Sequence, residues 1–312
     1  MAPEPIRVAV VGVGHLGRHH ARILAEMPDV RLEAVVDTIP DRAAEIAGSF
    51  ATAALTDYRD LVDRVDAVVV AVPTERHAEI AVPFLQQGTP VLVEKPMSRT
   101  LADANAMIAA AAAGQTLLAV GHTERHNPAV AIALRLVTAP RFIEVHRLSA
   151  FPDRSLDIDV VFDLMIHDLD VILAIVGPDV VSIEAVGVPV LTPQYDIANV
   201  RLRFASGCIA NITASRISKD RVRKIRFFQR DAYLSVDYAS QEVEGYRLVR
   251  KEPRPGIEGG AIPVERDEPL RRELADFVQA IRSGGPPLVD GAAGRRALML
   301  ASQIAERMET VG

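Results

Sequence analysis

The chain has 312 residues, 49% of them hydrophobic and 24% charged, which is enough length and apolar content for two folded domains. A net charge of −6 and a pI near 5.8 argue against a protein that binds nucleic acid or anionic membranes, because both need a basic surface. No apolar run approaches the length of a membrane helix, no leader pattern precedes the first apolar stretch, and the single cysteine, Cys208, has no intrachain disulfide partner. We therefore expect a cytoplasmic protein.

Short apolar stretches alternate with amphipathic ones in the first part of the chain. The expected strands are residues 6–11, 32–36, 67–72, 91–93 and 117–120. The stretches between them that have helical character include 15–26, 76–87 and 101–112. Apolar strands that are separated by helices predict a parallel sheet covered on both faces. We assign residues 1–121 to a nucleotide-binding domain with a doubly wound parallel sheet of the Rossmann type.

The first strand is followed by a glycine-rich loop with the G-x-G-x-x-G spacing of Gly12, Gly14 and Gly17. The loop opens a helix, and Asp37 ends the second strand, which completes the dinucleotide fingerprint. The glycines allow a tight turn, close approach of the pyrophosphate and close helix packing, and the helix start offers free N–H groups to phosphate. His15 and Leu16 lie within the loop and are counted among its cofactor contacts.

Asp37 favours NAD over NADP, because its carboxylate can accept hydrogen bonds from ribose hydroxyls and would repel a 2′-phosphate. Arg42 keeps NADP open as the second choice. Three histidines near the loop, His15, His19 and His20, lack a cysteine or carboxylate at ligand spacing, so we interpret them as solvated or packing residues and expect no metal.

The third and fourth strands end in residues that suit a reaction site. Pro73 and Thr74 follow the third strand, with His77 one turn later, and Glu94 and Lys95 follow the fourth. Ligands of a doubly wound sheet bind outside the carboxyl ends of the strands. These residues are therefore predicted to face the nicotinamide end of the cofactor.

From residue 141 onward the pattern changes to longer alternating strands joined by short turns, which indicates antiparallel sheet. One helical stretch, 160–176, precedes most of these strands, and two more, 269–281 and 292–308, close the chain. Residues 252–263, rich in Pro and Gly, are predicted to be a loop. We assign 122–312 to a second α/β domain, and leave open that the last helix packs back on the first domain.

Asp163 and His167 are spaced one turn apart on the predicted helix and share a face. A carboxylate beside an imidazole can orient the ring and favour its protonated form, which suits a base that takes a proton from an alcohol. An ordinary surface pair has the same spacing, so the pattern alone does not decide. Asp168 and Asp170 flank His167 but point apart on a helix, so a metal site is not expected.

These motifs together resemble the glucose-fructose oxidoreductase, inositol dehydrogenase and rhizopine catabolism protein family. The residues that carry the resemblance are the three loop glycines, Pro73, Thr74 and His77, Glu94, Lys95 and Pro96, and Asp163 with His167. The resemblance spans nearly the whole chain, and Glu-Lys-Pro is its most specific marker. It implies that Lys95 is catalytic, that Pro96 fixes the backbone, often through a cis bond, and that a large, mostly antiparallel open sheet in the second domain forms a homo-dimer or homo-tetramer.

The segments 121–128 and 164–172 resemble a branch of this family that oxidises the 3-hydroxyl of UDP-N-acetylglucosamine, for later transamination in lipid A synthesis. The chain departs from the family in lacking a Gly-rich turn before Asp163, and from the branch in having His126 where an aromatic is usual. Arg125 and Asn127 offer donors to a nucleotide sugar, although Arg125 equally suits a structural role at the domain junction. Arg154 is a second candidate for the diphosphate.

A basic stretch, 216–228, could meet a nucleotide diphosphate or RNA, but alternation within 221–227 favours one solvated face of a strand. The hypothesis is an NAD-dependent sugar dehydrogenase in which His167, oriented by Asp163 and helped by Lys95, removes the hydroxyl proton. Alternatives are a dehydrogenase or ketoreductase for another sugar, nucleotide sugar or inositol, and, from a different class, a non-catalytic NAD-binding sensor.

Overall fold

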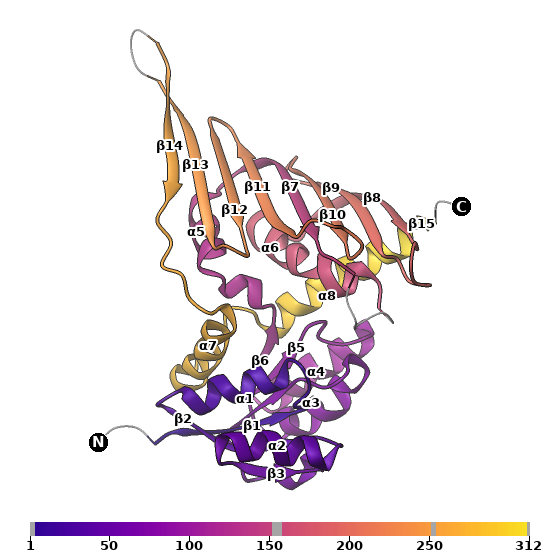
Figure 1. Ribbon diagram of the computed structural model, residues 1–312, viewed down its shortest axis with the longest axis vertical. Helices are drawn as coiled ribbons and strands as arrows, with labels where there is room; N and C mark the ends of the chain where they lie inside the picture. Colours follow the sequence, from indigo (N-terminus) through magenta and orange to yellow (C-terminus); the bar gives the residue numbers. More distant parts are fainter. Residues whose placement is uncertain (1–3, 152–157, 251–253, 311–312) are drawn as a thin grey trace. The chain divides into compact units, whose positions relative to one another are not determined.

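The computed structural model describes residues 4–151, 158–250 and 254–310, and the chain forms two compact units (Figure 1). The first unit consists of Met1–His122 and Leu270–Arg295, and the second of Thr123–Pro269 and Arg296–Gly312. None of the described helices is long and apolar enough to cross a membrane.

The first unit is built on a parallel sheet whose six described strands have the order β3-β2-β1-β4-β5-β6. The strands are β1 (Ile6–Val11), β2 (Val30–Val36), β3 (Ala53–Leu55), β4 (Ala67–Val70), β5 (Val91–Glu94) and β6 (Leu118–Gly121). The order reverses between β1 and β4, which is where a doubly wound sheet opens a crevice for a ligand. The predicted Rossmann fold is confirmed, and β3 is a strand that the sequence pattern did not reveal.

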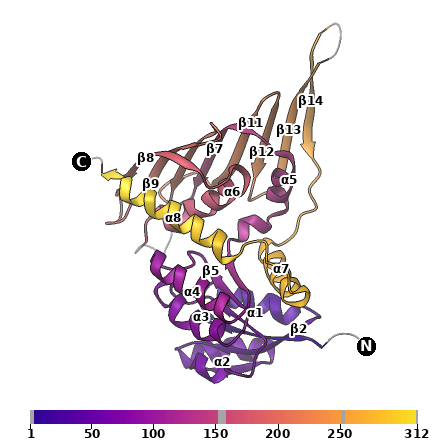
Figure 2. The same ribbon diagram turned by 180° about the vertical axis from the view of Figure 1, so that it is seen from behind.

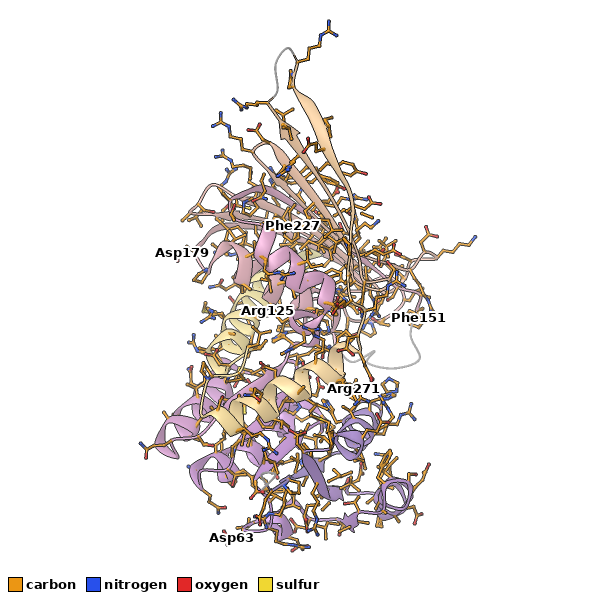
Figure 3. The ribbon with its side chains drawn as sticks, turned by 90° about the vertical axis from the view of Figure 1, so that its left-hand side faces the viewer. Asp63, Arg125, Phe151, Asp179, Phe227 and Arg271 are labelled. Carbon is orange, nitrogen blue, oxygen red and sulfur yellow. The ribbon has the colours of Figure 1, made fainter. Side chains whose placement is uncertain are left out.

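Helices of the first unit cover both faces of this sheet (Figure 2). They are α1 (Gly17–Glu26), α2 (Pro40–Phe50), α3 (His77–Gln86), α4 (Leu101–Ala113) and α7 (Pro269–Ser283), with the short turns η1 (Tyr58–Leu61) and η2 (Thr74–Arg76). One core contains Val8 and Val10 of β1 together with Leu274 and Phe277 of α7. A helix from late in the chain thus completes the packing of the first sheet.

The second unit carries a sheet of nine described strands in the order β14-β13-β12-β11-β7-β10-β9-β8-β15. The strands are β7 (Pro140–Leu148), β8 (Val180–Val188), β9 (Ile197–Phe204), β10 (Ile209–Ser215), β11 (Val222–Gln229), β12 (Ala232–Asp237), β13 (Glu242–Val249), β14 (Gly256–Ile262) and β15 (Glu309–Thr310). Neighbouring strands are antiparallel except for the pairs β7–β10 and β8–β15. The predicted large, mostly antiparallel sheet is confirmed.

One face of this sheet is buried under helices (Figures 1 and 2). They are α5 (Pro128–Leu136), α6 (Ile166–Val176) and the second part of α8 (Gly291–Arg307), and the short turns η3 (Thr123–His126) and η4 (Val161–Met165) adjoin them. Side chains on the two faces alternate in burial, as in β11, where Ile225 and Phe227 are fully buried and Arg226 and Phe228 are half-buried. The expected alternation within the basic stretch is confirmed for this strand.

The loop predicted for 252–263 is wrong, because Gly256–Ile262 forms the edge strand β14. Gly259 explains both why a loop was predicted and why β14 can pair closely with β13. A Cβ on this residue would lie 2.0 Å from the carbonyl oxygen of Gly245 on β13, so only glycine allows the two strands to approach this closely. A glycine that permits close pairing looks, in sequence, the same as one that makes a turn.

Candidate active site

The glycine loop between β1 and α1 has the geometry that a dinucleotide needs. Gly12 has a φ of +87°, and a Cβ at Gly17 would lie 1.8 Å from the carbonyl oxygen of Gly12. At Gly14, by contrast, a Cβ would meet nothing within 4 Å. The first and third glycines therefore build the turn, and the second leaves open space over which a phosphate can approach the backbone. His15 and Leu16 are exposed beside that space, and their contact with a cofactor stays a prediction.

Asp37 is nearly buried at the end of β2 and is fixed by the loop itself. Its Oδ2 accepts a hydrogen bond from the Val13 amide at 3.1 Å, and its Oδ1 accepts one from the Ile39 amide at 3.0 Å. The guanidinium of Arg42 donates to both oxygens at 3.3 and 3.4 Å from a side chain that is 43% exposed. Arg42 is therefore a partner of Asp37 here, and a ribose would compete with it for the carboxylate.

Lys95 follows β5 at a half-buried position, and its peptide bond to Pro96 is cis. The turn after β4 is tied to it by His77, whose Nε2 lies 2.9 Å from the carbonyl oxygen of Val72 and whose Nδ1 lies 3.1 Å from that of Pro96. Burial lowers the pKa of His77, and the carbonyl oxygens that face both ring nitrogens oppose this shift, because they accept hydrogen bonds from the protonated ring. His77 thus holds the strand-end loops together from inside, and its predicted contact with a cofactor stays a prediction.

Pro73 and Thr74 lie in the turn that His77 holds, Pro73 exposed and Thr74 half-buried. The structure therefore gathers the predicted residues of the first unit at the carboxyl ends of β1, β2, β4 and β5, which is the edge where nucleotides bind in such sheets.

Sequence reasoning missed one buried polar pair, which involves His20 on α1. It is fully buried, and its Nε2 lies 2.7 Å from Oε1 of Glu94. Its spacing from Gly17, Ala21 and Leu24, all buried, places it on the inner face of α1, and this was the signal available in the sequence. The interpretation of His20 as a packing residue agrees with its buried position, but it did not include the pairing with the carboxylate of Glu94.

In the second unit, Asp163 and His167 lie at the start of the helical stretch that was predicted as one helix. The stretch begins as a single π-helical turn, η4, and continues as α6. Asp159 caps this turn, accepting from the amides of Val161 and Phe162 at 2.8 and 3.3 Å. Short π-helical segments are frequent at functional sites. Asp163 and His167 are both half-buried, and their catalytic roles stay predictions.

The capping carboxylate of Asp159 is itself perturbed. Burial raises the pKa of Asp159 above its ordinary value, and the charge of Asp163 adds a smaller increase. The backbone amides of the π-helical turn oppose that rise by hydrogen bonding the charged form. The start of this turn therefore holds two interacting carboxyl groups in a partly desolvated setting.

The predicted substrate residues of the second unit are engaged by the protein. Arg125 donates to Asp170 at 3.3 Å. Asn127 is buried and caps α5, accepting from the Ala129 amide at 3.0 Å and donating to the Tyr238 carbonyl at 3.0 Å. These contacts favour the structural reading of Arg125. Arg154, the other candidate, lies outside the described residues.

Asp168 is paired with an arginine of the sheet. Arg147 of β7 binds it through two hydrogen bonds of 2.6 and 3.1 Å, and both side chains are almost fully buried. The same guanidinium also reaches Glu124 at 3.2 Å and lies over the ring of Tyr238. Arg147 therefore ties α6 to η3 and to the sheet.

The basic stretch begins with a buried residue, Arg216, which precedes the part whose alternation predicted a solvated face. Arg216 is 1% exposed and donates from Nε to Oδ1 of Asp196 at 2.8 Å and from Nη1 to the carbonyl oxygen of Ile158 at 2.6 Å. Ile158 immediately precedes the capped start of the π-helical turn. Pairing with a buried carboxylate compensates for the burial of the guanidinium.

Comparisons with known proteins agree with this architecture. The profile of a family described as an oxidoreductase family with an NAD-binding Rossmann fold matches residues 6–122, and the profile of the GFO/IDH/MocA C-terminal domain matches residues 101–234. The chain is 38% identical over 307 residues to UDP-N-acetylglucosamine 3-dehydrogenase of Acidithiobacillus ferrooxidans, covering 97% of each chain. It is 26% identical over 319 residues to inositol 2-dehydrogenase of Rhizobium meliloti, covering 95% of this chain and 94% of that one.

A solved structure is similar over the same length. The crystal form P21 of UDP-N-acetylglucosamine 3-dehydrogenase GnnA from Acidithiobacillus ferrooxidans has a TM-score of 0.92 and 37% sequence identity, with 98% of each chain covered. The likeness to this solved structure therefore extends over nearly the whole chain.

Proposed function

Because the chain belongs to the glucose-fructose oxidoreductase, inositol dehydrogenase and rhizopine catabolism family of NAD-binding oxidoreductases, we propose that it oxidises the 3-hydroxyl of UDP-N-acetylglucosamine to a ketone with NAD as the acceptor. The observation that carries the substrate is the similarity to a UDP-N-acetylglucosamine 3-dehydrogenase over 97% of both chains. The 3-keto sugar would be ready for transamination, as a lipid A pathway requires.

The residues of the first unit fit the cofactor. The open space over Gly14 and the N-terminus of α1 suit the pyrophosphate, and Asp37 suits the ribose hydroxyls. When bound, NAD supplies the carbon that accepts hydride from the alcohol. The pairing of Arg42 with Asp37 leaves NADP as the less favoured cofactor, since a 2′-phosphate would still meet the carboxylate.

We assign the proton transfer to His167, Asp163 and Lys95. His167 takes the proton of the sugar hydroxyl as the carbon loses hydride, and Asp163 orients the ring and stabilises its charged form. Lys95 donates to the same oxygen and favours its negative charge as the proton leaves. The half-buried positions of all three leave them partly accessible to a substrate.

The test is NADH formation by the purified protein with NAD and a panel that contains UDP-N-acetylglucosamine, free sugars and inositol. A carbonyl trap is included because oxidation of a secondary alcohol is often uphill. We expect turnover of the nucleotide sugar, with His167→Ala and Lys95→Met each reducing kcat by about 10²–10⁴-fold. His146→Ala, a half-buried histidine on β7 outside the proposed site, is the matched control and should retain activity.

The same panel separates the alternatives. Turnover of inositol or a free sugar, without turnover of the nucleotide sugar, would identify that compound as the substrate. The 26% identity to an inositol 2-dehydrogenase is the reason to include inositol. NADH binding without turnover of any alcohol would favour the sensor. Full activity of Lys95→Met would refute the assigned roles.

We also propose that the open face of the second sheet joins copies of the chain into a homo-dimer or homo-tetramer. Four aromatic residues at paired positions form a row across β7, β11, β12 and β13 on the face away from the helices: Phe142, Phe228, Tyr233 and Tyr246. Neighbouring ring centroids are 5.5, 5.1 and 6.3 Å apart. Tyr246 is 42% exposed. An aromatic row with this exposure favours association with a matching surface.

A further inference from the structure

Building on the dehydrogenase proposed above, we propose that His20 and Glu94 form a buried clamp that positions Lys95 for the reaction. Neither residue is assigned contact with the substrate. Both act through the backbone and the charge of Lys95, so they are positioning residues.

The clamp is a chain of short contacts through one carboxylate. Oε1 of Glu94 lies 2.7 Å from Nε2 of His20, and Oε2 accepts a hydrogen bond from the backbone amide of Lys95 at 3.1 Å. The side chains of His20 and Glu94 are 0% and 7% exposed. Because an ionised carboxylate can only accept, Nε2 of His20 carries the hydrogen of this bond.

Glu94 keeps its negative charge despite its burial. Burial alone would raise its pKa, but the hydrogen bond and charge of His20, followed by the charge of Lys95, outweigh this and hold the pKa below its ordinary value. The third group at this place is the carboxylate of Glu273 on α7, also buried, with an oxygen within 4.8 Å of the other two ligand atoms. The negative charge of Glu94 therefore acts on the ammonium of Lys95, the next residue in the chain.

The position of His20 connects the clamp to the cofactor loop. His20 lies on α1, the helix that starts at Gly17 of the glycine loop, whereas Lys95 follows β5. The pair thus joins the helix that would hold the pyrophosphate to the strand end that carries the lysine. His77 holds the other neighbour of Lys95 through the Pro96 carbonyl, so the residues on both sides of Lys95 are bound to a buried histidine.

Room for the clamp comes from Gly121 on the adjacent strand β6. A Cβ at this residue would lie 3.1 Å from Oε2 of Glu94, which is closer than ordinary contact. Gly121→Ala therefore presses on the carboxylate without removing a hydrogen-bonding group. It provides a second perturbation of the clamp that is independent of His20.

The experiment compares His20→Leu, which fills the space without a donor, with His20→Gln, whose amide NH₂ can reach Glu94. His19→Leu is the matched control, because it makes the same change at the next residue of α1. For each variant we would measure kcat, NADH affinity from the fluorescence of the bound cofactor, and the pH dependence of Lys95 acetylation by mass spectrometry.

We expect His20→Leu to lower kcat by about 10–100-fold, because small misplacements of a reacting group have effects of this size. NADH affinity should stay within about threefold of the wild-type value, which is well below a tenfold change. His20→Gln should recover most of kcat, and Gly121→Ala should lie between the two. The acetylation profile of Lys95 should shift in His20→Leu and stay unchanged in His19→Leu.

Unchanged kcat and an unchanged Lys95 acetylation profile in both His20→Leu and Gly121→Ala would overturn the clamp. Stoichiometric zinc or another metal bound by the wild type and lost in His20→Leu would also overturn it, in favour of a metal site. If the wild type turns over no alcohol, the proposed function fails, but the acetylation profile still decides on the clamp.

Discussion

The pair of Asp196 and Arg216 offers a direct test of how the second unit is held together. Asp196 is fully buried, and its Oδ2 accepts from the backbone amides of Val190, Leu191 and Thr192 at 2.9, 2.6 and 2.9 Å. Its Oδ1 accepts from the hydroxyl of Thr192 at 2.7 Å and from Arg216 at 2.8 Å. Every acceptor position of the carboxylate faces a donor.

Asp196→Asn replaces one of these oxygens by an NH₂ group of the same size. If the NH₂ faces the amides, three N–H groups lose their acceptor, and if it faces Arg216, a buried guanidinium meets another donor. Removing the charge of one partner in a buried ion pair lowers the free energy of unfolding by about 3–5 kcal/mol. We expect the free energy of unfolding to fall by that amount. Asp220→Asn, at an exposed aspartate between β10 and β11, should change the free energy of unfolding by less than about 0.5 kcal/mol.

The assay is urea unfolding followed by circular dichroism, repeated at several pH values. The amides and Arg216 hold the pKa of Asp196 well below its ordinary value, against the opposing effect of burial. A depressed folded pKa means that the stabilisation is complete above the unfolded pKa and is lost as the pH falls toward the folded one. Wild type should lose this contribution in acid, and Asp196→Asn should not. Equal stability of the two proteins at neutral pH would refute the reasoning.

The remaining predictions concern the cofactor loop and the sheet face. Gly17→Ala should lower the free energy of unfolding by about 1–3 kcal/mol, measured by urea unfolding, because its Cβ would overlap the Gly12 carbonyl. Gly14→Ala, whose Cβ meets nothing within 4 Å, should leave stability unchanged and weaken NADH binding. Equal stability of the two variants would contradict this difference. Phe228→Arg, on the open face of the second sheet, should reduce the mass found by light scattering to that of the monomer. Arg31→Ala, at an exposed position on β2, should leave the mass unchanged. An unchanged mass in Phe228→Arg would show that the open face is not the interface.

Much of the first unit was predictable, because its signals lie in contiguous residues. Glycine spacing, apolar strands and a charged residue at a strand end are local patterns, and the rules for parallel sheets convert them into a shared edge. Lys95 and Asp37 could therefore be placed at that edge from sequence. Their roles, like those of Asp163 and His167, stay predictions.

The pairings of polar residues were decided only by the tertiary structure. His20 with Glu94, and Arg216 with Asp196, join residues far apart in the chain, and in sequence a buried charge that has a partner looks the same as a solvated one. Arg125 with Asp170 shows the same limit, since the sequence does not reveal that Nη1 of Arg125 donates to this carboxylate.

The sequence by itself determined the parallel sheet, the glycine loop and the alternating strands, because backbone preference and the period of apolar residues act within single elements. Only the tertiary structure decided that α7 joins the first sheet, that β14 is a strand, and that His20 lies against the carboxylate before Lys95. These outcomes depend on the fit between elements that are distant in sequence, which local preference does not encode.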